Sequence, residues 1–496
     1  MHYQAYNAAL DADSYKPSMY VQYPPNTTRI FDYIEARGSS SKPSDETIES
    51  LKKFLSPEML KLFIAENTKQ PFHKTVFSGL QPILIKYLSS PITPEMVEYA
   101  AQEWAEHGEP FNKEGWMRIA TEFNGRIPLH IRAVPEGTVV PLRNALITIE
   151  CLHDDFEWLV THFETMLLRV WYPITISTLS AEIRRIIKGF LIDTADNLDG
   201  LDFKHHDFGS RGVSSMESAE IGGAAHMIAG SRGTDNMVAI QHLRTYYAAD
   251  SMPAFSIPAA EHSTITSWTR ECEIDAYRNM LRQFGKPGKM FAVVIDSYNY
   301  REAVKMWGTI LKDELIASGA TLVLRPDSGV PKYVVLEVMQ LAELYFGTTL
   351  NTKGYKMLPS YVRVLQGDGI TLETIPGILQ ILKDNQYSTD NLAMGQGGGL
   401  LQMVNRDTLQ FACKCSAALV NGEWRDVYKD PIGDSGKRSK RGRLSLYRHK
   451  ITGEYVTLRL EEADLTIYED AMVTVFYDGG VFVEDYETIR ARAVQY

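Results

Sequence analysis

The chain has 496 residues, of which 44% are hydrophobic and 23% charged, a composition typical of globular proteins that argues against long disordered segments. Its net charge of -11 argues against binding to nucleic acid or to an anionic membrane surface. The four cysteines form no CxxC pair, so the sequence indicates neither a zinc site nor a disulfide framework.

The start of the chain shows no basic region followed by an apolar core, as a signal peptide would have. No apolar run approaches the roughly 18 residues that are needed to span a bilayer. We therefore expect a cytoplasmic protein with reduced thiols. A length prior of about 150 residues per domain predicts two or three domains.

Three segments follow one another along the chain. Residues 1–165 mix helical patterns with a β-rich region at 129–150, which a turn at 134–137 interrupts, and they predict an α+β domain. Residues 166–400 alternate strand endings with helical patterns and predict a β/α barrel. Residues 401–496 contain short strands at 411–416, 455–460 and 472–477, which are expected to rejoin the N-terminal domain.

The barrel prediction rests on strand endings that repeat through the second segment. They lie at 203–207, 255–258, 293–296, 322–327, 364–368 and 393–399, with helical patterns at 216–228, 274–284, 303–317 and 333–345. Parallel β/α proteins bind ligands at the carboxyl ends of their strands. The fold class that follows is α/β, an irregular TIM-like barrel that carries an active site at those ends.

Three carboxylates follow apolar strands, namely Asp296, Asp327 and Asp368. If they converge at one barrel mouth, their mutual repulsion calls for Mg²⁺ with a phosphorylated sugar, because Mg²⁺ prefers one or two carboxylates plus phosphate oxygens. The alternative is that each aspartate only caps the helix that follows its strand.

A glycine cluster at 395–399 precedes a possible helix at 400–406, so its amide groups could hold a phosphate. Arg325 and Arg406 strengthen this hypothesis, since guanidinium groups match phosphate oxygens in a bidentate way. Gly367 and Gly369 beside Asp368 permit close approach of a ligand. The alternative is a simple glycine-rich turn.

His262 follows the strand ending at 255–258 and is either a reactive imidazole or a structural histidine. Phe208 and Arg211 offer a ring and a cation on a glycine-flanked loop, although Phe208 could belong to the core. His205 and His206 do not suggest a metal site, because neighbours on a strand point to opposite faces. The basic run at 437–443 is a solvated loop, a phosphate site or, least expected, a nucleic-acid site.

Taken together, these segments resemble the nicotinamide phosphoribosyltransferases, which have the type II phosphoribosyltransferase barrel. The resembling stretches, in chain order, are 13–16, 22–27, 171–175, 206–209, 211–215, 233–235, 258–266, 325–329, 366–369, 397–402 and 437–440. The resemblance implies a homodimer whose active sites are shared across the interface. It also implies transfer of phosphoribose from phosphoribosyl pyrophosphate to nicotinamide, giving nicotinamide mononucleotide and pyrophosphate.

The resemblance further implies a role for individual residues. Phe208 and the partner subunit's Tyr15 would stack on the pyridine ring, Asp235 would accept from its carboxamide, and Arg325 would lie beside the base. The ribose and its 5-phosphate would be held by Arg325, Asp327, Gly367, Asp368, Gly397, Gly398 and Arg406. Asp296 and Asp327 would serve Mg²⁺ and the pyrophosphate, with Arg211 near the diphosphate.

His262 matches the family histidine that ATP phosphorylates, which would couple ATP hydrolysis to product formation. Arg37, Lys414 and Lys437 match positions near those phosphates, so the resemblance gives the basic run a role in ATP binding. The catalytic group that the resemblance implies is therefore His262, Asp296 and Asp327, with Mg²⁺ as cofactor and ATP as co-substrate.

A carboxylate at 235 would repel nicotinate, which favours nicotinamide as the base. The nearest alternative is a nicotinate phosphoribosyltransferase, and another is a binding protein of the same fold without turnover. The sequence departs from the family pattern at Gln396 and Ala292, where serine is expected, and in a longer segment at 229–232. We expect the bulkier Gln396 to change how the glycine loop holds a phosphate.

Overall fold

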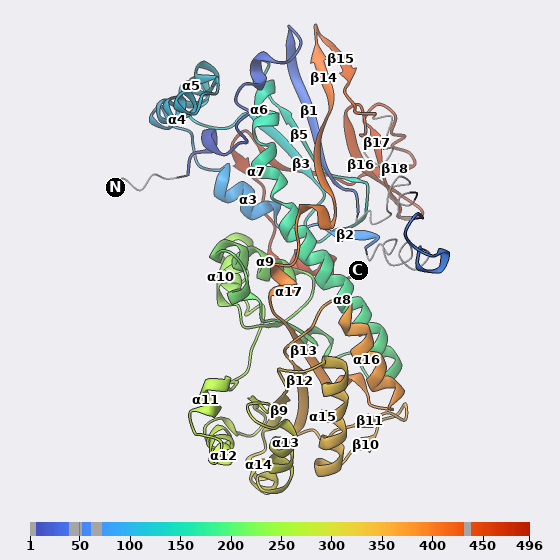
Figure 1. The fold of residues 1–496 in the computed structure, drawn as a ribbon. Helices are drawn as coiled ribbons and strands as arrows, with labels where there is room; N and C mark the ends of the chain where they lie inside the picture. Colours follow the sequence, from blue (N-terminus) through green and yellow to red (C-terminus); the bar gives the residue numbers. More distant parts are fainter. Residues whose placement is uncertain (1–5, 39–48, 50–51, 61–71, 431–437) are drawn as a thin grey trace. The chain divides into compact units, whose positions relative to one another are not determined.

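The computed structural model describes residues 6–38, 49, 52–60, 72–430 and 438–496 (Figure 1). The chain forms two compact units. Unit 1 contains residues 1–178, 246–248 and 405–495, and unit 2 contains residues 179–245 and 249–404 together with Tyr496. The sequence placed domain boundaries near 165 and 400, whereas the structure divides the chain after Thr178 and after Val404.

Unit 1 is built on a seven-stranded sheet with the order β15-β14-β1-β5-β3-β19-β20. Its strands are β1 (Thr27–Ala36), β3 (Leu129–Ala133), β5 (Ala145–Cys151), β14 (Phe411–Val420), β15 (Glu423–Asp426), β19 (Val473–Tyr477) and β20 (Gly480–Val481). The central strand β1 pairs antiparallel with β5 on one side and with β14 on the other. The expected α+β domain made from both ends of the chain is thereby confirmed.

Smaller elements complete unit 1. Two further sheets contain β2 (Lys74–Val76) with β4 (Val139–Pro141), and β16 (Leu444–His449) with β17 (Tyr455–Arg459) and β18 (Tyr468–Asp470). Its helices include α3 (Leu80–Tyr87), α4 (Pro94–His107), α5 (Lys113–Glu122), α6 (Glu157–His162), α7 (Glu164–Leu168) and α18 (Tyr486–Ala493). Thr93 caps α4 by accepting from the Met96 amide, and Gly108 ends that helix in the left-handed conformation.

Unit 2 is built on a parallel six-stranded sheet with the order β7-β6-β13-β12-β9-β8. The strands are β6 (His205–Asp207), β7 (Gly233–Thr234), β8 (Met290–Val294), β9 (Thr321–Arg325), β12 (Val362–Gln366) and β13 (Leu392–Gln396). An extended segment at residues 255–260 bridges both edges of this sheet. Phe255 forms a parallel bridge with Gly233 in β7, and Ala259 forms another with Ala292 in β8, so both edge strands are reached. The sheet therefore curls into the irregular barrel that the sequence predicted.

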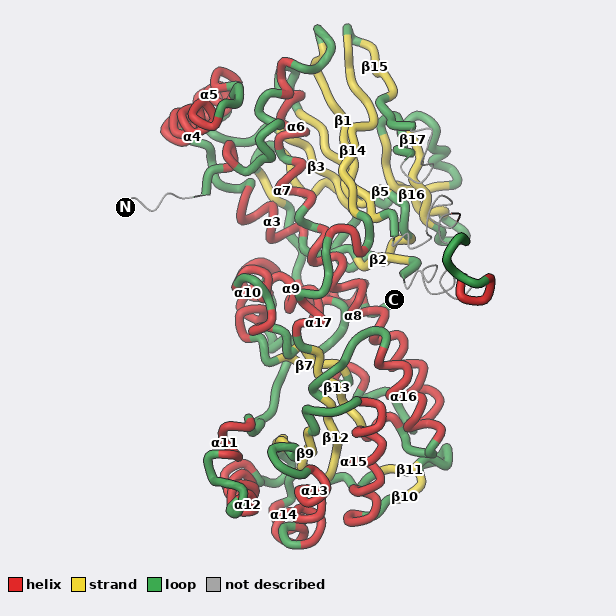
Figure 2. Tube along the Cα trace, viewed as in Figure 1, coloured by secondary structure: helices red, strands yellow, loops and turns green. Residues whose placement is uncertain are grey.

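Helices lie beside this sheet and at the ends of its strands (Figure 2). They are the C-terminal part of α8 (Trp171–Thr194), α9 (Met216–Ile228), α10 (Met237–Tyr247), α11 (His262–Thr266), α12 (Glu273–Phe284), α13 (Tyr300–Thr309), α14 (Lys312–Ser318), α15 (Pro331–Phe346), α16 (Thr374–Asp384) and α17 (Gly398–Leu401). Between helices and barrel interior the strands are buried on both faces, which explains apolar runs such as Phe291 to Val294. A small hairpin, β10 (Thr349–Leu350) with β11 (Lys356–Met357), lies outside the main sheet.

Two predicted helices were wrong in their extent. The pattern at 303–317 forms two helices, because α13 ends at Thr309 and α14 begins at Lys312. Gly308, which packs closely against Tyr345, and the β-branched Thr309 and Ile310 are all poor helix formers. The expected helix at 400–406 is instead the short α17 followed by a 3-10 turn at Arg406–Thr408, which Asn405 caps.

Within the described part of the chain, no helix combines the length and the apolar character that crossing a membrane requires.

Candidate active site

The carboxyl ends of the barrel strands surround a cavity of about 680 Å³. Because β8, β9, β12 and β13 are parallel neighbours, the residues that follow them lie at one edge of the sheet. The lining includes most of the residues that the sequence singled out in unit 2, namely Phe208, Arg211, Asp235, Arg325, Asp327, Gly367, Asp368, Gly397 and Gly398. Convergence of the strand-end residues, on which the sequence interpretation depended, is therefore observed.

Asp296 connects His262 to Asp327 beside this cavity. One carboxylate oxygen of Asp296, Oδ1, lies 3.0 Å from Nε2 of His262. The other, Oδ2, accepts a hydrogen bond from the Asp327 backbone amide at 3.0 Å and another from the Ser328 hydroxyl at 2.6 Å. Both oxygens of Asp296 are thus engaged, and the ring of His262 is oriented by a carboxylate.

The two strand-end aspartates differ in their electrostatic setting. Burial opposes ionisation of Asp296, but hydrogen bonds from Ser328, from His262 and from the Asp327 amide outweigh burial and lower the pKa of its carboxyl. Burial raises the pKa of Asp327, an effect that Arg325 offsets in part and that Asp296 and Asp368 reinforce. The surroundings of Asp327 therefore disfavour its charged form, whereas those of Asp296 favour it.

The two glycine segments bring backbone close to the cavity. A Cβ atom built on Gly367 would lie 2.7 Å from Oδ1 of Asp327, so only glycine fits there without a shift. Gly212 approaches Gly398 so closely that a Cβ atom on Gly212 would lie 3.1 Å from the Gly398 Cα. Bare peptide groups thus face the same space as Arg211 and Arg325.

Gln396 stands in the glycine cluster that the sequence singled out. Its side chain is buried, and its Oε1 lies 2.9 Å from Nε2 of His205 on the neighbouring strand β6. Burial lowers the pKa of His205 to about 4, so the imidazole is neutral near pH 7. Gln396 therefore supports the glycine loop from behind, and its side chain does not line the cavity.

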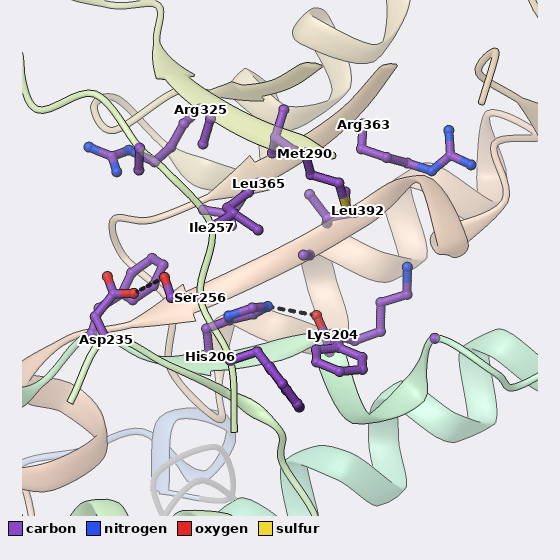
Figure 3. A pocket seen from close by; sticks show the side chains of 18 of the residues that line it. Lys204, His206, Asp235, Ser256, Ile257, Met290, Arg325, Arg363, Leu365 and Leu392 are labelled. Atoms are coloured by element: carbon purple, nitrogen blue, oxygen red, sulfur yellow. Dashed lines mark hydrogen bonds between the residues drawn. The ribbon is translucent and has the colours of Figure 1, made fainter. Parts of the chain in front are cut away.

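A second, mainly apolar cavity of about 360 Å³ runs into the barrel (Figure 3). Its apolar lining includes Phe208, Ile257, Ala292, Val323 and Leu365. At one side the Ser256 hydroxyl donates to Oδ1 of Asp235 at 2.6 Å, the contact that Figure 3 marks with a dashed line. This cavity shares Phe208, Asp235, Ala259 and Arg325 with the larger one, so the two spaces adjoin.

The other side of the apolar cavity carries the cations Lys204 and Arg363 (Figure 3). Lys204 pairs with Asp390 at 2.8 Å. Nη1 of Arg363 donates to the backbone carbonyls of Pro359 and Val362 at 2.8 and 2.7 Å. Burial lowers the pKa of both side chains. These groups were not singled out from the sequence.

Five of the predicted site residues belong to unit 1. Tyr15 is 57% exposed, and the ammonium of Lys16 lies 5.1 Å from the centre of its ring. Arg37 pairs with Glu35 at 2.8 Å, and Lys414 donates to the Cys413 carbonyl at 2.8 Å. Arg406 pairs with Asp407 at 3.1 Å. Lys437 lies outside the described residues.

Sequence reasoning missed the contacts that hold these groups in place. No role was assigned to the hydrogen bonds that Ser256 donates to Asp235 and Ser328 donates to Asp296. The buried Asp207, which precedes Phe208, had no assigned role either. Ser328 stands next to Asp327, so its position after a strand was a usable signal. The pairing of Ser256 with Asp235 depends on the closure of the barrel, which no sequence spacing reveals.

No group of three or more metal-ligating side chains occurs in the regions that the structure describes. Two aspartates next to a phosphate-sized cavity nonetheless suit Mg²⁺, which takes most of its oxygen ligands from phosphates and water. Burial and the neighbouring carboxylates Asp296 and Asp368 disfavour the charged form of Asp327, an effect that a cation bound there would offset.

Comparison with known proteins identifies the family. The model of the nicotinate phosphoribosyltransferase (NAPRTase) family matches residues 203–477, and that of the nicotinamide phosphoribosyltransferase N-terminal domain matches residues 7–131. The chain belongs to this phosphoribosyltransferase family. It is therefore a pentosyltransferase, and the expected enzyme class is confirmed.

Relatives within the family match the chain over most of its length. A nicotinamide phosphoribosyltransferase of Xanthomonas campestris pv. campestris is 47% identical and covers 99% of both chains. Another, from Mycoplasma genitalium, is 31% identical and covers 88% of this chain and 95% of its own.

Two solved structures share the fold of this chain at low sequence identity. A nicotinate-nucleotide pyrophosphorylase from Pyrococcus furiosus has a TM-score of 0.58 at 14% identity, covering 99% of this chain and 97% of its own. Human nicotinic acid phosphoribosyltransferase has a TM-score of 0.53 at 14% identity, covering 97% and 92%. These matches confirm the type II phosphoribosyltransferase fold.

Proposed function

We propose that this enzyme transfers the phosphoribosyl group of phosphoribosyl pyrophosphate to nicotinamide, giving nicotinamide mononucleotide and pyrophosphate. One observation carries the proposal: an apolar cavity that suits a pyridine adjoins a polar cavity of carboxylates, guanidiniums and glycine backbone that suits a sugar with its phosphates. Phe208, Asp235 and Arg325 stand where the two spaces meet. The relatives named nicotinamide phosphoribosyltransferase add support for the choice of base.

The reaction needs positioning and charge stabilisation more than a protein nucleophile. The pyridine nitrogen attacks C1 of the ribose, a C1–N bond forms, and the C1–O bond to pyrophosphate breaks with its electrons on the leaving group. Stacking on Phe208 and on the partner subunit's Tyr15 would fix the approach of the ring, and good orientation supplies on the order of 7 to 11 kcal/mol. Asp296 and Asp327 would hold Mg²⁺, which neutralises charge on the diphosphate.

Asp235 sets the choice between the two pyridines in this proposal. With Oδ1 engaged by Ser256, its Oδ2 remains to accept from the amide NH₂ of nicotinamide. The carboxylate of nicotinate at the same place would repel Asp235. A nicotinate phosphoribosyltransferase is the second candidate, because the family model that covers the barrel carries that name.

ATP coupling through His262 is the finer part of the proposal. Because Asp296 engages Nε2 of His262, Nδ1 is the ring nitrogen left to attack the γ-phosphorus of ATP. The P–O bond to ADP would then break as the N–P bond forms, and water would later hydrolyse the phosphohistidine. Arg37, Lys414 and Lys437 are proposed to bind the ATP phosphates.

The test mixes the protein with phosphoribosyl pyrophosphate and each pyridine in turn, with Mg²⁺ or with EDTA, and identifies the products by mass. We expect the mononucleotide from nicotinamide with Mg²⁺ and none with EDTA. Asp235→Ala should lower kcat/KM for nicotinamide by about ten- to a hundredfold, the range for a hydrogen bond to a charged group. Preferential conversion of nicotinate by the wild type would contradict the proposed base.

The ATP arm of the experiment uses γ-labelled ATP. We expect label on the wild type, no label on His262→Ala, and surviving synthesis without ATP in that variant. Equal labelling of both proteins would remove His262 from this role.

A further inference from the structure

Asp207 lies behind the proposed base site at the end of strand β6, and no catalytic step described above uses it. Its side chain has no measurable exposure, with 0% of its surface accessible. It directly precedes Phe208, and it stands 28 residues before Asp235 in the chain. A buried carboxyl group needs several hydrogen-bond partners, so its partners show what it stabilises.

One oxygen of Asp207 holds the loop that carries Phe208. Oδ1 accepts from the Gly209 backbone amide at 2.8 Å. The backbone amide of Phe208 itself donates to the Gln396 carbonyl at 2.9 Å, which fixes the other side of the same loop. The direction of the Phe208 ring thus depends on the carboxylate immediately before it.

The other oxygen holds the loop that carries Asp235. Oδ2 accepts from Nδ2 of Asn236 at 3.1 Å and from the Thr234 hydroxyl at 3.4 Å, the two residues that flank Asp235. The Asp235 backbone amide also donates to the Asp207 carbonyl at 3.0 Å. Asn236 is anchored further by donating to the Ala219 carbonyl at 2.9 Å.

We propose that Asp207 is a positioning residue that sets the distance between Phe208 and Asp235, and so determines how a pyridine carboxamide is held between ring and carboxylate. The four hydrogen bonds that Asp207 accepts from Gly209, Thr234, Asn236 and the Asp235 amide all come from residues within one position of Phe208 or Asp235. The inference rests on the proposed function for the identity of the base, but the geometry it describes is independent of turnover.

The variant Asp207→Asn tests this arrangement with almost no change in size. Gly209 and Asn236 both present N–H donors, so an amide group in place of the carboxylate must face one of them with its own NH₂. One of the two loops then loses its acceptor. We expect KM for nicotinamide to rise by about ten- to a hundredfold, the cost of one hydrogen bond to a charged group. KM for phosphoribosyl pyrophosphate should change less than twofold.

Hydrogen exchange measured by mass spectrometry gives a readout that does not depend on activity. In Asp207→Asn we expect faster exchange in one of the two peptides covering 208–212 and 233–237, whichever faces the new NH₂ group, and unchanged exchange in a peptide covering 362–369. Thr194→Val serves as the matched control, because it removes a buried hydroxyl that accepts from the Thr389 amide at 3.0 Å, before strand β13 begins. That variant should lose thermal stability without a change in either KM.

Unchanged exchange in both loops, or an equal rise in both KM values, would overturn the positioning role. If the wild type fails to convert nicotinamide while Asp207→Asn still loosens one of these loops, the proposed function falls and the positioning role stands.

Discussion

Asp32 is a buried carboxyl group that the proposed reaction does not use. It lies in the central strand β1, and its Oδ1 finds no hydrogen-bond partner in the described structure. The thiol of Cys413 lies 3.8 Å from Oδ2. Burial and the nearby Glu164, opposed by Lys16, raise the pKa of Asp32 to about 7 from an ordinary 3.8.

This raised pKa predicts a pH-dependent stability. Between about pH 4 and pH 7 the folded chain keeps a proton that the unfolded chain releases, so the carboxyl costs stability as pH rises. Asp32→Asn should therefore raise the free energy of unfolding at pH 8 by a few kcal/mol, because each pKa unit of the shift corresponds to about 1.4 kcal/mol. The advantage should shrink toward pH 4, as urea unfolding at several pH values would show.

The exposed Asp154, which pairs with Arg29 at 3.1 Å, supplies the control for Asp32. Asp154→Asn should change stability little at any pH, because exposed ion pairs contribute little. A stability gain in Asp32→Asn that is the same at pH 4 and pH 8 would show that the charge of Asp32 is not the cause.

At the scale of elements, strand β13 sets the place of Phe208. A Cβ atom built on Gly395 would lie 1.9 Å from the Phe208 ring, which is far inside contact distance. Gly395→Ala should therefore displace the ring and raise KM for nicotinamide by more than tenfold, since the stacking partner and its orientation are lost together. Steady-state kinetics with each substrate varied in turn measure this effect.

Gly189→Ala is the matched control on helix α8, where an added Cβ atom meets nothing within 4 Å. That variant should keep both KM values and gain about 0.5 to 1 kcal/mol of stability, because alanine is the better helix former. Equal kinetics for Gly395→Ala and the wild type would show that the ring relaxes without functional loss.

Strand endings were predictable from the sequence. Exact helix limits, and contacts between residues far apart in the sequence, were not. Apolar runs buried on both faces are distinctive, so Asp327 after β9 and Gly367 after β12 could be placed at one edge. The apolar periodicity at 303–317 does not show the break after Thr309, which separates α13 from α14. The direction of Gln396 toward His205 depends on which strands are neighbours, and the sequence alone does not show that.

At the scale of the whole molecule, we propose a homodimer in which the partner subunit's Tyr15 lies beside Phe208, as the family resemblance implies. The exposure of Tyr15 agrees with a surface role in this chain. Tyr15→Ala and Asp235→Ala should each be poorly active alone. Mixed after unfolding and refolding together, they should regain up to about a quarter of wild-type activity, because half of the dimers would hold one intact site.

Size-exclusion chromatography with light scattering would verify the dimer in the same samples. No regain of activity in verified mixed dimers would show that Tyr15 and Asp235 serve the same site from one chain.

The segment at 255–260 joins the two edge strands of the sheet, β7 and β8, by single-residue bridges. It also supplies Ser256 and Ile257 to the apolar cavity and precedes helix α11, which begins at His262. The same segment therefore both completes the barrel and forms part of the wall of the apolar cavity. If the segment at 255–260 detaches from the sheet, the closed barrel and one wall of the proposed base site are lost together. We therefore expect activity to be lost before global unfolding on heating.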